Sequence, residues 1–212
     1  MSQDSSSPVA PVPKDPKTER GKRTRRRLLS AAAVEFGERG YTDSAISGIT
    51  QRAEVGLGTF YVYFNSKEEI FRALVADMGA LTRGWIAERI GDVRNRLEAE
   101  RVGVAAYIDF VRKHKGFHRI IMESQFVAPD AYYDYYRAFA DAYRRHLAAA
   151  EARGEISAGD GEVRVWALMG ASSFLGLRYG VWEPDADIEQ VASATADLIA
   201  NGLAPKPKQT KR

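Results

Sequence analysis

Apolar residues recur every three or four positions along almost the whole chain, and this spacing is the feature that most constrains the fold. After Ser66, for example, the apolar positions fall at Ile70, Leu74, Met78, Leu81 and Trp85. Such spacing marks one face of an α-helix, and we find neither the alternation typical of strands nor an internal repeat. The sequence therefore predicts an all-α protein of about nine helices.

Glycines, prolines and capping residues divide this pattern into separate helices. A first helix is expected at about 20–39, stopped by Gly40, and a short second one with Ser44 as its N-cap. Ser66 and Glu69 form a capping box that opens a long fourth helix. The remaining helices are expected at about 57–63, 98–115, 117–126, 129–153, 160–181 and 185–202.

Composition excludes several classes of protein. The 212 residues contain no cysteine, so disulfides, a thiolate nucleophile and a cysteine-based zinc site are excluded. The longest apolar run, 165–177, is shorter than the roughly 18 residues that a membrane helix needs. The N-terminus lacks the apolar centre of a secretory signal, and we expect a cytoplasmic protein.

Positive charge is concentrated in one short stretch. Between Lys17 and Arg27 lie seven cations and one carboxylate, a net charge of +6, whereas the whole chain carries +3. This run, which includes Arg23 and Arg25, suits contacts to phosphates, which carry no sequence information. A solvated tail is the alternative interpretation.

Two short helices joined by the tight turn 53–56 are typical of a helix-turn-helix, whose second helix enters the major groove of DNA. On helix 57–63, Phe60 and Phe64 lie four positions apart and are expected to anchor it. A helical hairpin with exposed aromatic residues is the alternative. The residues predicted to reach bases or phosphates from this helix and the next are Gly58, Thr59, Tyr61, Tyr63 and Lys67.

Residues 24–71, RRRLLSAAAVEFGERGYTDSAISGITQRAEVGLGTFYVYFNSKEEIF, resemble the DNA-binding domain of TetR/AcrR-family transcriptional regulators. The resemblance implies a homodimer that binds a palindromic operator, usually as a repressor released by a small molecule. It also implies that Ser44 contacts a phosphate. Three positions depart from the family pattern: Glu54, where glycine is common; Gly56, where serine is usual; and Leu57, where the residue is often polar.

The organisation expected from these observations has four parts. They are a disordered N-terminal tail at 1–16, a helix-turn-helix DNA-binding domain at 17–65, an effector-binding and dimerisation domain at 66–203, and a disordered basic tail at 204–212. No cofactor is expected.

Aromatic residues crowd the region between 107 and 143, where buried tyrosine hydroxyls would need partners. An ordinary core explains the crowding equally well. The alternative is an effector pocket for an apolar or aromatic molecule, for which the candidate residues are Tyr107, Phe110, Met122, Phe126, Tyr132, Tyr136, Phe139, Trp166, Met169, Ser173 and Phe174.

The stretch 114–136 also weakly resembles regulators that respond to acyl-CoA or related acids. A CoA ligand would need cations at the pocket mouth, for which the candidates are Arg112, Lys113, Lys115, Arg119, Arg137 and Arg178. Ordinary solvated surface explains these cations as well.

The last two helices, 160–181 and 185–202, carry small residues among large apolar ones, which predicts self-association across a two-fold axis. Packing within one chain is the alternative.

Two rival functions stay open. One is a regulator that binds DNA without an effector. The other is a metal-binding enzyme using His114 and His118 with Glu123, although no recognisable catalytic motif accompanies them.

Overall fold

The computed structural model describes residues 16–203, and within this range the chain forms nine α-helices and one π-helical segment, with no strand. The all-α prediction is confirmed. The predicted tails at 1–16 and 204–212 lie, apart from Pro16, outside the described residues. The elements are α1 (Glu19–Asp43), α2 (Ile46–Arg52), α3 (Leu57–Tyr63), α4 (Lys67–Ile90), α5 (Arg96–Lys113), α6 (Phe117–Val127), α7 (Pro129–Ala152), α8 (Gly161–Gly176), η1 (Leu177–Trp182) and α9 (Ile188–Asn201).

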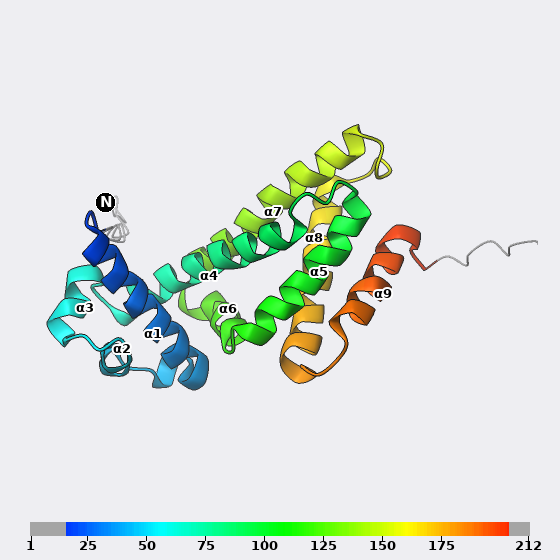
Figure 1. Ribbon diagram of the computed structural model, residues 1–212. Helices are drawn as coiled ribbons and strands as arrows, with labels where there is room; N and C mark the ends of the chain where they lie inside the picture. The colour runs from blue at the N-terminus through cyan, green and yellow to red at the C-terminus, as the bar shows by residue number, and fades with distance from the viewer. Residues whose placement is uncertain (1–15, 204–212) are drawn as a thin grey trace, which may run out of the picture.

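The first three helices lie at one end of the molecule and α9 lies at the other, with α4 leading from the first group into the second (Figure 1). Helix α5 packs against α4, α8 and α9, and α7 packs between α4 and α8. Because α4 contributes to both groups, it is the helix best placed to connect them mechanically.

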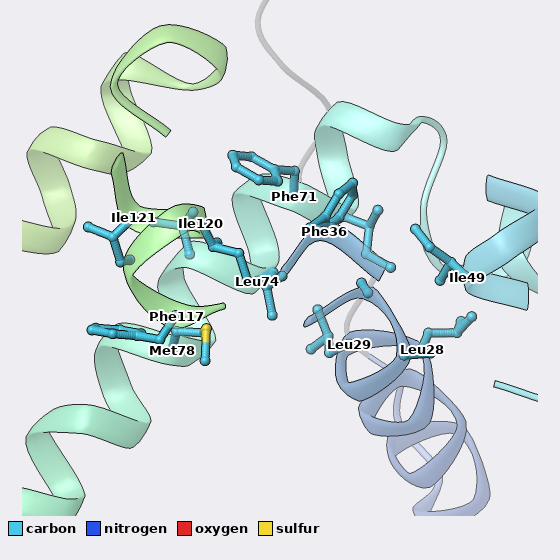
Figure 2. Close-up of a cluster of buried hydrophobic side chains, with 14 of the residues drawn as sticks. Leu28, Leu29, Phe36, Ile49, Phe71, Leu74, Met78, Phe117, Ile120 and Ile121 are labelled. Carbon is cyan, nitrogen blue, oxygen red and sulfur yellow. The ribbon is translucent and has the colours of Figure 1, made fainter. Parts of the chain in front are cut away.

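One apolar cluster extends from α1–α3 into α4, α5, α6 and α7, whereas α8 and α9 contribute to two smaller clusters. Figure 2 shows Phe36 of α1 beside Phe71 of α4, with Ile120 of α6 on the other side of α4. The Phe36 and Phe71 rings meet edge to face with centroids 5.1 Å apart. Burial of such side chains stabilises a fold by about 1.5–3 kcal/mol each, so a shared core ties α1 firmly to α4 and α6.

The boundary between α1 and α2 differs from the prediction. Gly40 has a positive φ of 78° and breaks the helix, but helical hydrogen bonding resumes as far as Asp43. The N-cap of α2 is Ala45, so the prediction of Ser44 as N-cap is wrong. The Ser44 hydroxyl instead donates to the carbonyl oxygens of Glu35 and Gly40, because it lies buried against the kink of α1.

The start of α4 agrees with the predicted capping box in part. The Ser66 hydroxyl oxygen accepts a hydrogen bond from the Glu69 backbone N–H at 3.0 Å. The Glu69 carboxylate reaches back one residue further than the motif requires and accepts from the Asn65 N–H at 2.7 Å. The first bond satisfies an N–H group that a helix N-terminus would otherwise leave unpaired, and the second fixes the residue before the N-cap.

The end of α8 was predicted as α-helix up to residue 181, but the α-helical part stops at Gly176 and continues as η1. Gly176 and Gly180 lie against α5, where an added Cβ would come within 2.4 Å of the Tyr107 ring and 2.6 Å of Val111. The close approach to α5 therefore needs glycine at both positions. No helix among residues 16–203 is long and apolar enough to span a membrane.

Candidate functional site

Helix α3 is anchored by two phenylalanines and presents its other side to solvent. Phe60 and Phe64 are fully buried, as their four-residue spacing predicts. Tyr61 is 48% exposed, and Thr59 and Tyr63 are half-buried at the edge of the same surface. A Cβ added at Gly58 would meet nothing within 4 Å, so the backbone there is open to a partner. This side of α3, which also exposes Leu57 and Val62, is therefore open to a partner, as a recognition helix must be.

The turn before α3 places a non-glycine residue in a left-handed conformation. Glu54 has a φ of 50°, and the N–H groups of Glu54 and Val55 donate to the carbonyl oxygens of Gln51 and Thr50. This is a Schellman arrangement, in which the left-handed residue is usually glycine. The departure noted in the sequence at Glu54 thus falls at the one turn position where a glycine would be favoured.

Several cations of the basic run border a groove between α1 and this turn. Arg20, Arg23 and Arg27 line it together with Thr59 of α3. Arg27 is tied to the end of α2, because its guanidinium donates to the Ala53 carbonyl oxygen. Arg23 is exposed beside α3, in a position suited to a phosphate contact.

Three residues predicted to contact DNA are engaged elsewhere. Arg25 points toward α4, with its guanidinium over the Phe64 ring at 5.5 Å, and its charge opposes the effect of burial, which raises the pKa of Asp77. The Ser44 hydroxyl is buried, as described above. The Lys67 ammonium donates to the Tyr41 and Ser44 carbonyl oxygens at 2.7 and 2.9 Å, closing the end of α1. The phosphate contacts predicted for these three residues would therefore compete with contacts inside the protein, and they stay predictions.

A cavity of about 220 Å³ lies between α4, α5, α7 and α8. Its wall is mostly apolar, with a few polar groups, as is typical of a small-molecule site. The residues that line it are Arg83, Ile86, Ala87, Ile90, Arg96, Ala99, Gly103, Tyr107, Tyr135, Tyr136, Phe139, Ala142, Tyr143, His146, Met169, Ser172 and Ser173.

Five of the predicted effector residues line this cavity, namely Tyr107, Tyr136, Phe139, Met169 and Ser173. The other six do not. Phe110 is fully buried in the core, where it stacks on His114 at 3.9 Å, and Tyr132 packs against Tyr136 outside the lining. The remaining four are exposed to solvent, Phe126 by 81% and Phe174 by 74%. They are Met122, Phe126, Trp166 and Phe174.

The tyrosines of the cavity are held protonated. Burial raises the pKa of Tyr107 to about 12, although hydrogen bonds to Ser173 and Tyr135 act in the opposite direction. Burial likewise raises the pKa of Tyr135 and Tyr136, and the neighbouring tyrosines add to the effect. At neutral pH these phenols are therefore hydrogen-bond donors rather than phenolates.

A buried ionic network closes the cavity at the start of α5. The Arg96 guanidinium lies 2.8 Å from the Glu100 carboxylate, which is almost fully buried and also accepts a hydrogen bond from the Tyr143 hydroxyl. Burial and the Glu100 charge hold the pKa of Tyr143 well above its ordinary value. The Glu100 carboxylate, which is not part of the cavity lining, therefore largely neutralises the charge of Arg96.

None of the six cations proposed for the pocket mouth lines the cavity. Arg112 donates to the carbonyl oxygens of Tyr179 and Ala186, and Arg178 pairs with Glu183 at 2.8 Å. The metal-site alternative gains no support either. His114 is stacked on Phe110, and among residues 16–203 no cluster of three or more His, Asp or Glu side chains could hold a metal ion.

The comparison with known proteins identifies the helix-turn-helix. Residues 28–74 match the sequence profile of "Bacterial regulatory proteins, tetR family", which covers α2 and α3 with most of α1 and the start of α4. Residues 28–74 are therefore a DNA-binding domain of the TetR family.

Two curated relatives and one solved structure illustrate how far the likeness extends. The chain is 44% identical over 64 residues to the "Uncharacterized HTH-type transcriptional regulator YdgC" of Bacillus subtilis, covering 30% of this chain and 33% of YdgC. It is 29% identical over 103 residues to the "HTH-type transcriptional activator FasR" of Mycolicibacterium smegmatis, covering 49% of this chain and 47% of FasR. The chain thus spans a third to a half of these relatives.

Beyond the helix-turn-helix the likeness is one of fold. The crystal structure of "a transcriptional regulator FadR from Bacillus subtilis in complex with stearoyl-CoA" superposes with a TM-score of 0.72 at 19% identity, covering 84% of this chain and 99% of FadR. The C-terminal helices of this chain therefore share the fold of the FadR structure.

The TetR-type helix-turn-helix is fastened to the C-terminal helices through α6, a contact that sequence reasoning missed. A Cβ added at Gly116, whose φ is 87°, would lie 2.4 Å from the Gly37 Cα, so the two backbones touch directly. Arg119 donates to the Glu38 carbonyl oxygen at 2.8 Å, and the Glu123 carboxylate accepts from the Tyr41 N–H at 2.7 Å. Helix α6 therefore forms hydrogen bonds with α1 on both sides of the kink at Gly40.

Sequence reasoning also missed the contribution of α4 to the cavity. Arg83, Ile86, Ala87 and Ile90 fall at positions i, i+3, i+4 and i+7, which is one helical face. The periodicity is visible in the sequence, but an arginine, an alanine and two isoleucines on one face do not distinguish a cavity wall from an ordinary core.

Proposed function

We propose that the protein is a ligand-responsive transcriptional regulator, a repressor that binds a palindromic operator as a homodimer and is released by a small apolar or aromatic effector. The observation that carries DNA binding is the exposure of Tyr61 on a helix whose two phenylalanines are fully buried. An aromatic residue is expensive to leave in water, and here its hydroxyl is directed to the surface that would meet a major groove.

In this proposal the DNA contacts come from α3 and the start of α1. Thr59, Tyr61 and Tyr63 supply hydroxyl groups, and Gly58 allows close approach of the backbone. Arg23 supplies a charge for the phosphates beside the groove.

An exposed apolar surface on α8 and α9 supports a homodimer. On α8 the large exposed residues Val163, Trp166 and Phe174 are interspersed with the small residues Ala167 and Ala171. Packing within the chain covers only one side of α9, where Ala192 lies against α5, and leaves Leu198 exposed. A second copy related by a two-fold axis would bury both surfaces, and it would present two recognition helices to a palindrome.

The cavity supports a ligand-released regulator over one that needs no effector. Its apolar wall and protonated tyrosines suit a small molecule with an apolar body, of which acyl-CoA or a related acid is our candidate class. The bound stearoyl-CoA of the FadR structure shows that this fold accommodates such a compound in another protein.

Helix α4 gives the proposed switch a physical route. One end of α4 lines the cavity with Arg83 and Ile90, and the other holds the end of α1 through Lys67. A ligand that tilts this 24-residue helix would move the helix-turn-helix at its far end. In a dimer that movement changes the spacing of two recognition helices, which must match grooves about 34 Å apart.

Selection of binding sites from random DNA duplexes, followed by fluorescence anisotropy, tests the proposal. We expect salt-dependent binding to the selected palindrome and a loss of about tenfold or more in Tyr61→Ala, because a lost base contact costs about 1–3 kcal/mol. Tyr133→Ala is the matched control, since Tyr133 is an exposed tyrosine on α7, far from α3 along the chain. Unchanged binding in Tyr61→Ala would refute the assignment of α3.

A further inference from the structure

The cavity has an unbalanced positive charge. Two arginines, Arg83 and Arg96, line it together with His146, whereas no Asp or Glu of the described chain does. Arg96 is offset by the buried Glu100 carboxylate at 2.8 Å. Arg83 has no such partner: among residues 16–203 it makes neither a hydrogen bond nor an ion pair. A half-buried guanidinium in an apolar wall without a counter-charge is costly unless a ligand supplies one.

Arg83 is held in place by packing rather than by polar bonds. Its guanidinium lies over the Phe139 ring, 5.3 Å from the centroid. A Cβ added at Gly79, one turn earlier on α4, would lie 3.2 Å from Arg83 Nη1 and 3.0 Å from Tyr135 Cδ2. The Arg83 guanidinium and the edge of the Tyr135 ring therefore both lie against α4 at Gly79, side by side in the cavity wall.

The remaining lining extends away from this cation. Along α7 the cavity runs from Tyr135 to His146, eleven residues or roughly 17 Å at the helical rise. Between these ends the wall combines aliphatic side chains such as Ile86 and Ile90 with aromatic ones such as Tyr143. At the far end the Arg96 Nε–H is buried without a hydrogen-bond partner in the described chain. The cavity therefore has its available charge at the Arg83 end and a mostly apolar wall beyond it.

The size of the cavity also limits the ligand. A volume of about 220 Å³ is below the 300–1,000 Å³ usual for drug-sized ligands. A coenzyme A group, with its nucleotide and pantetheine arm, is too large to be enclosed here together with an acyl chain. A free carboxylic acid with a compact or linear apolar body fits both the volume and the charge.

We propose that the effector cavity binds a free apolar carboxylic acid, whose carboxylate pairs with Arg83 beside the Tyr135 ring. The planar guanidinium can donate two parallel hydrogen bonds to a carboxylate, which gives charge neutralisation and orientation together. The apolar body lies along Ile86 and Ile90 toward Arg96. This assignment rests on the proposed effector function and names the chemistry of its ligand.

Isothermal titration calorimetry of the full chain with hexanoate, decanoate and phenylpropanoate tests the assignment. Each acid is compared with its alcohol, and decanoate also with decanoyl-CoA. We expect at least one acid to bind at least about tenfold more tightly than its alcohol, because a charge-assisted bond is worth about 1.5–3 kcal/mol.

In Arg83→Met the preference for that acid should disappear, while binding of the alcohol stays unchanged. Methionine keeps the length and packing of the side chain but removes the charge. Arg145→Met is the matched control, because Arg145 lies exposed on α7 outside the cavity lining. Thermal melting of both variants checks that the fold is retained.

Three results would overturn the assignment: no acid binds more tightly than its alcohol, the acid binds Arg83→Met as tightly as wild type, or only the CoA thioester binds. Operator binding is measured separately, with and without the acid. Arg83-dependent binding of an acid that leaves operator affinity unchanged would confirm the ligand site and refute the proposed release mechanism.

Discussion

At the scale of single residues, the turn of the helix-turn-helix holds a departure from the family pattern, Glu54, that has a conformational consequence. Glu54 occupies a left-handed position with a φ of 50°, which costs an L-residue about 1–2 kcal/mol relative to its usual conformations. The two backbone hydrogen bonds that close the turn force this conformation on whichever residue stands there. The sequence marks the position as unusual, and the dihedral angle explains why.

Glu54→Gly should therefore stabilise the protein, by about 1 kcal/mol, because glycine adopts positive φ without a Cβ clash. Urea unfolding followed by circular dichroism measures the change. Glu54→Ala serves as the control, since alanine also removes the contact with Arg27 but retains the backbone strain. Equal stabilities of the Gly and Ala variants would show that the left-handed conformation is not strained.

At the scale of elements, the contact between α1 and α6 connects the helix-turn-helix to the cavity-bearing helices. Two glycines let the backbones touch, and the polar groups of Arg119 and Glu123 hold the α1 carbonyls and the N–H that follows the kink. Because these bonds are directed, α6 fixes the orientation of α1 as well as its position. In the proposed switch, a movement that starts at the cavity would therefore reach the helix-turn-helix through α4 and also through the rigid contact between α6 and α1.

Gly116→Ala should disrupt the contact between α1 and α6. Gly154→Ala is the matched control: its φ is also positive, at 72°, but an added Cβ there would meet nothing within 4 Å. We expect a loss of about 1–2 kcal/mol in Gly154→Ala from backbone strain alone. Gly116→Ala should cost about 1–3 kcal/mol more from overpacking against Gly37, as measured by urea unfolding. Equal losses of stability in the two variants would mean that the α1–α6 contact accommodates the added methyl group without destabilising the fold.

At the scale of the whole molecule, α8 and α9 lie away from the end that α1–α3 form (Figure 1), and both carry exposed apolar residues. A surface of this kind is characteristic of an interface rather than of a monomer. In the proposed dimer it sets the separation of the two helix-turn-helices, although it is distant from both in the chain.

Phe174→Ser should convert the proposed dimer to a monomer at micromolar concentration and weaken operator binding by at least about tenfold, because half of the palindrome is then left unread. Native mass spectrometry measures the assembly. Phe126→Ser is the control, since Phe126 is similarly exposed but lies on α6. A monomeric wild-type protein, or a dimer that persists in Phe174→Ser, would refute the proposed interface.

The fold class, the nine helices and the anchoring of α3 could be predicted from the sequence because they depend on short-range order. The spacing of Phe60 and Phe64 defines one helical face regardless of the partner that covers it. The capping residues of α4 act within a single turn, and the helix-turn-helix motif is a contiguous pattern. Such features are encoded by residues close together in the chain.

Only the tertiary structure decided which faces meet. Phe126 and Phe174 have the same hydrophobic character as Tyr107 and Phe139, but the first two face solvent and the other two line a cavity. Likewise, nothing local distinguishes Lys67, which closes the end of α1, from a lysine free to bind phosphate, or Arg83 from its paired neighbours. Helical periodicity fixes the direction of a side chain relative to its own axis, whereas burial and pairing depend on how helices distant in sequence pack around it.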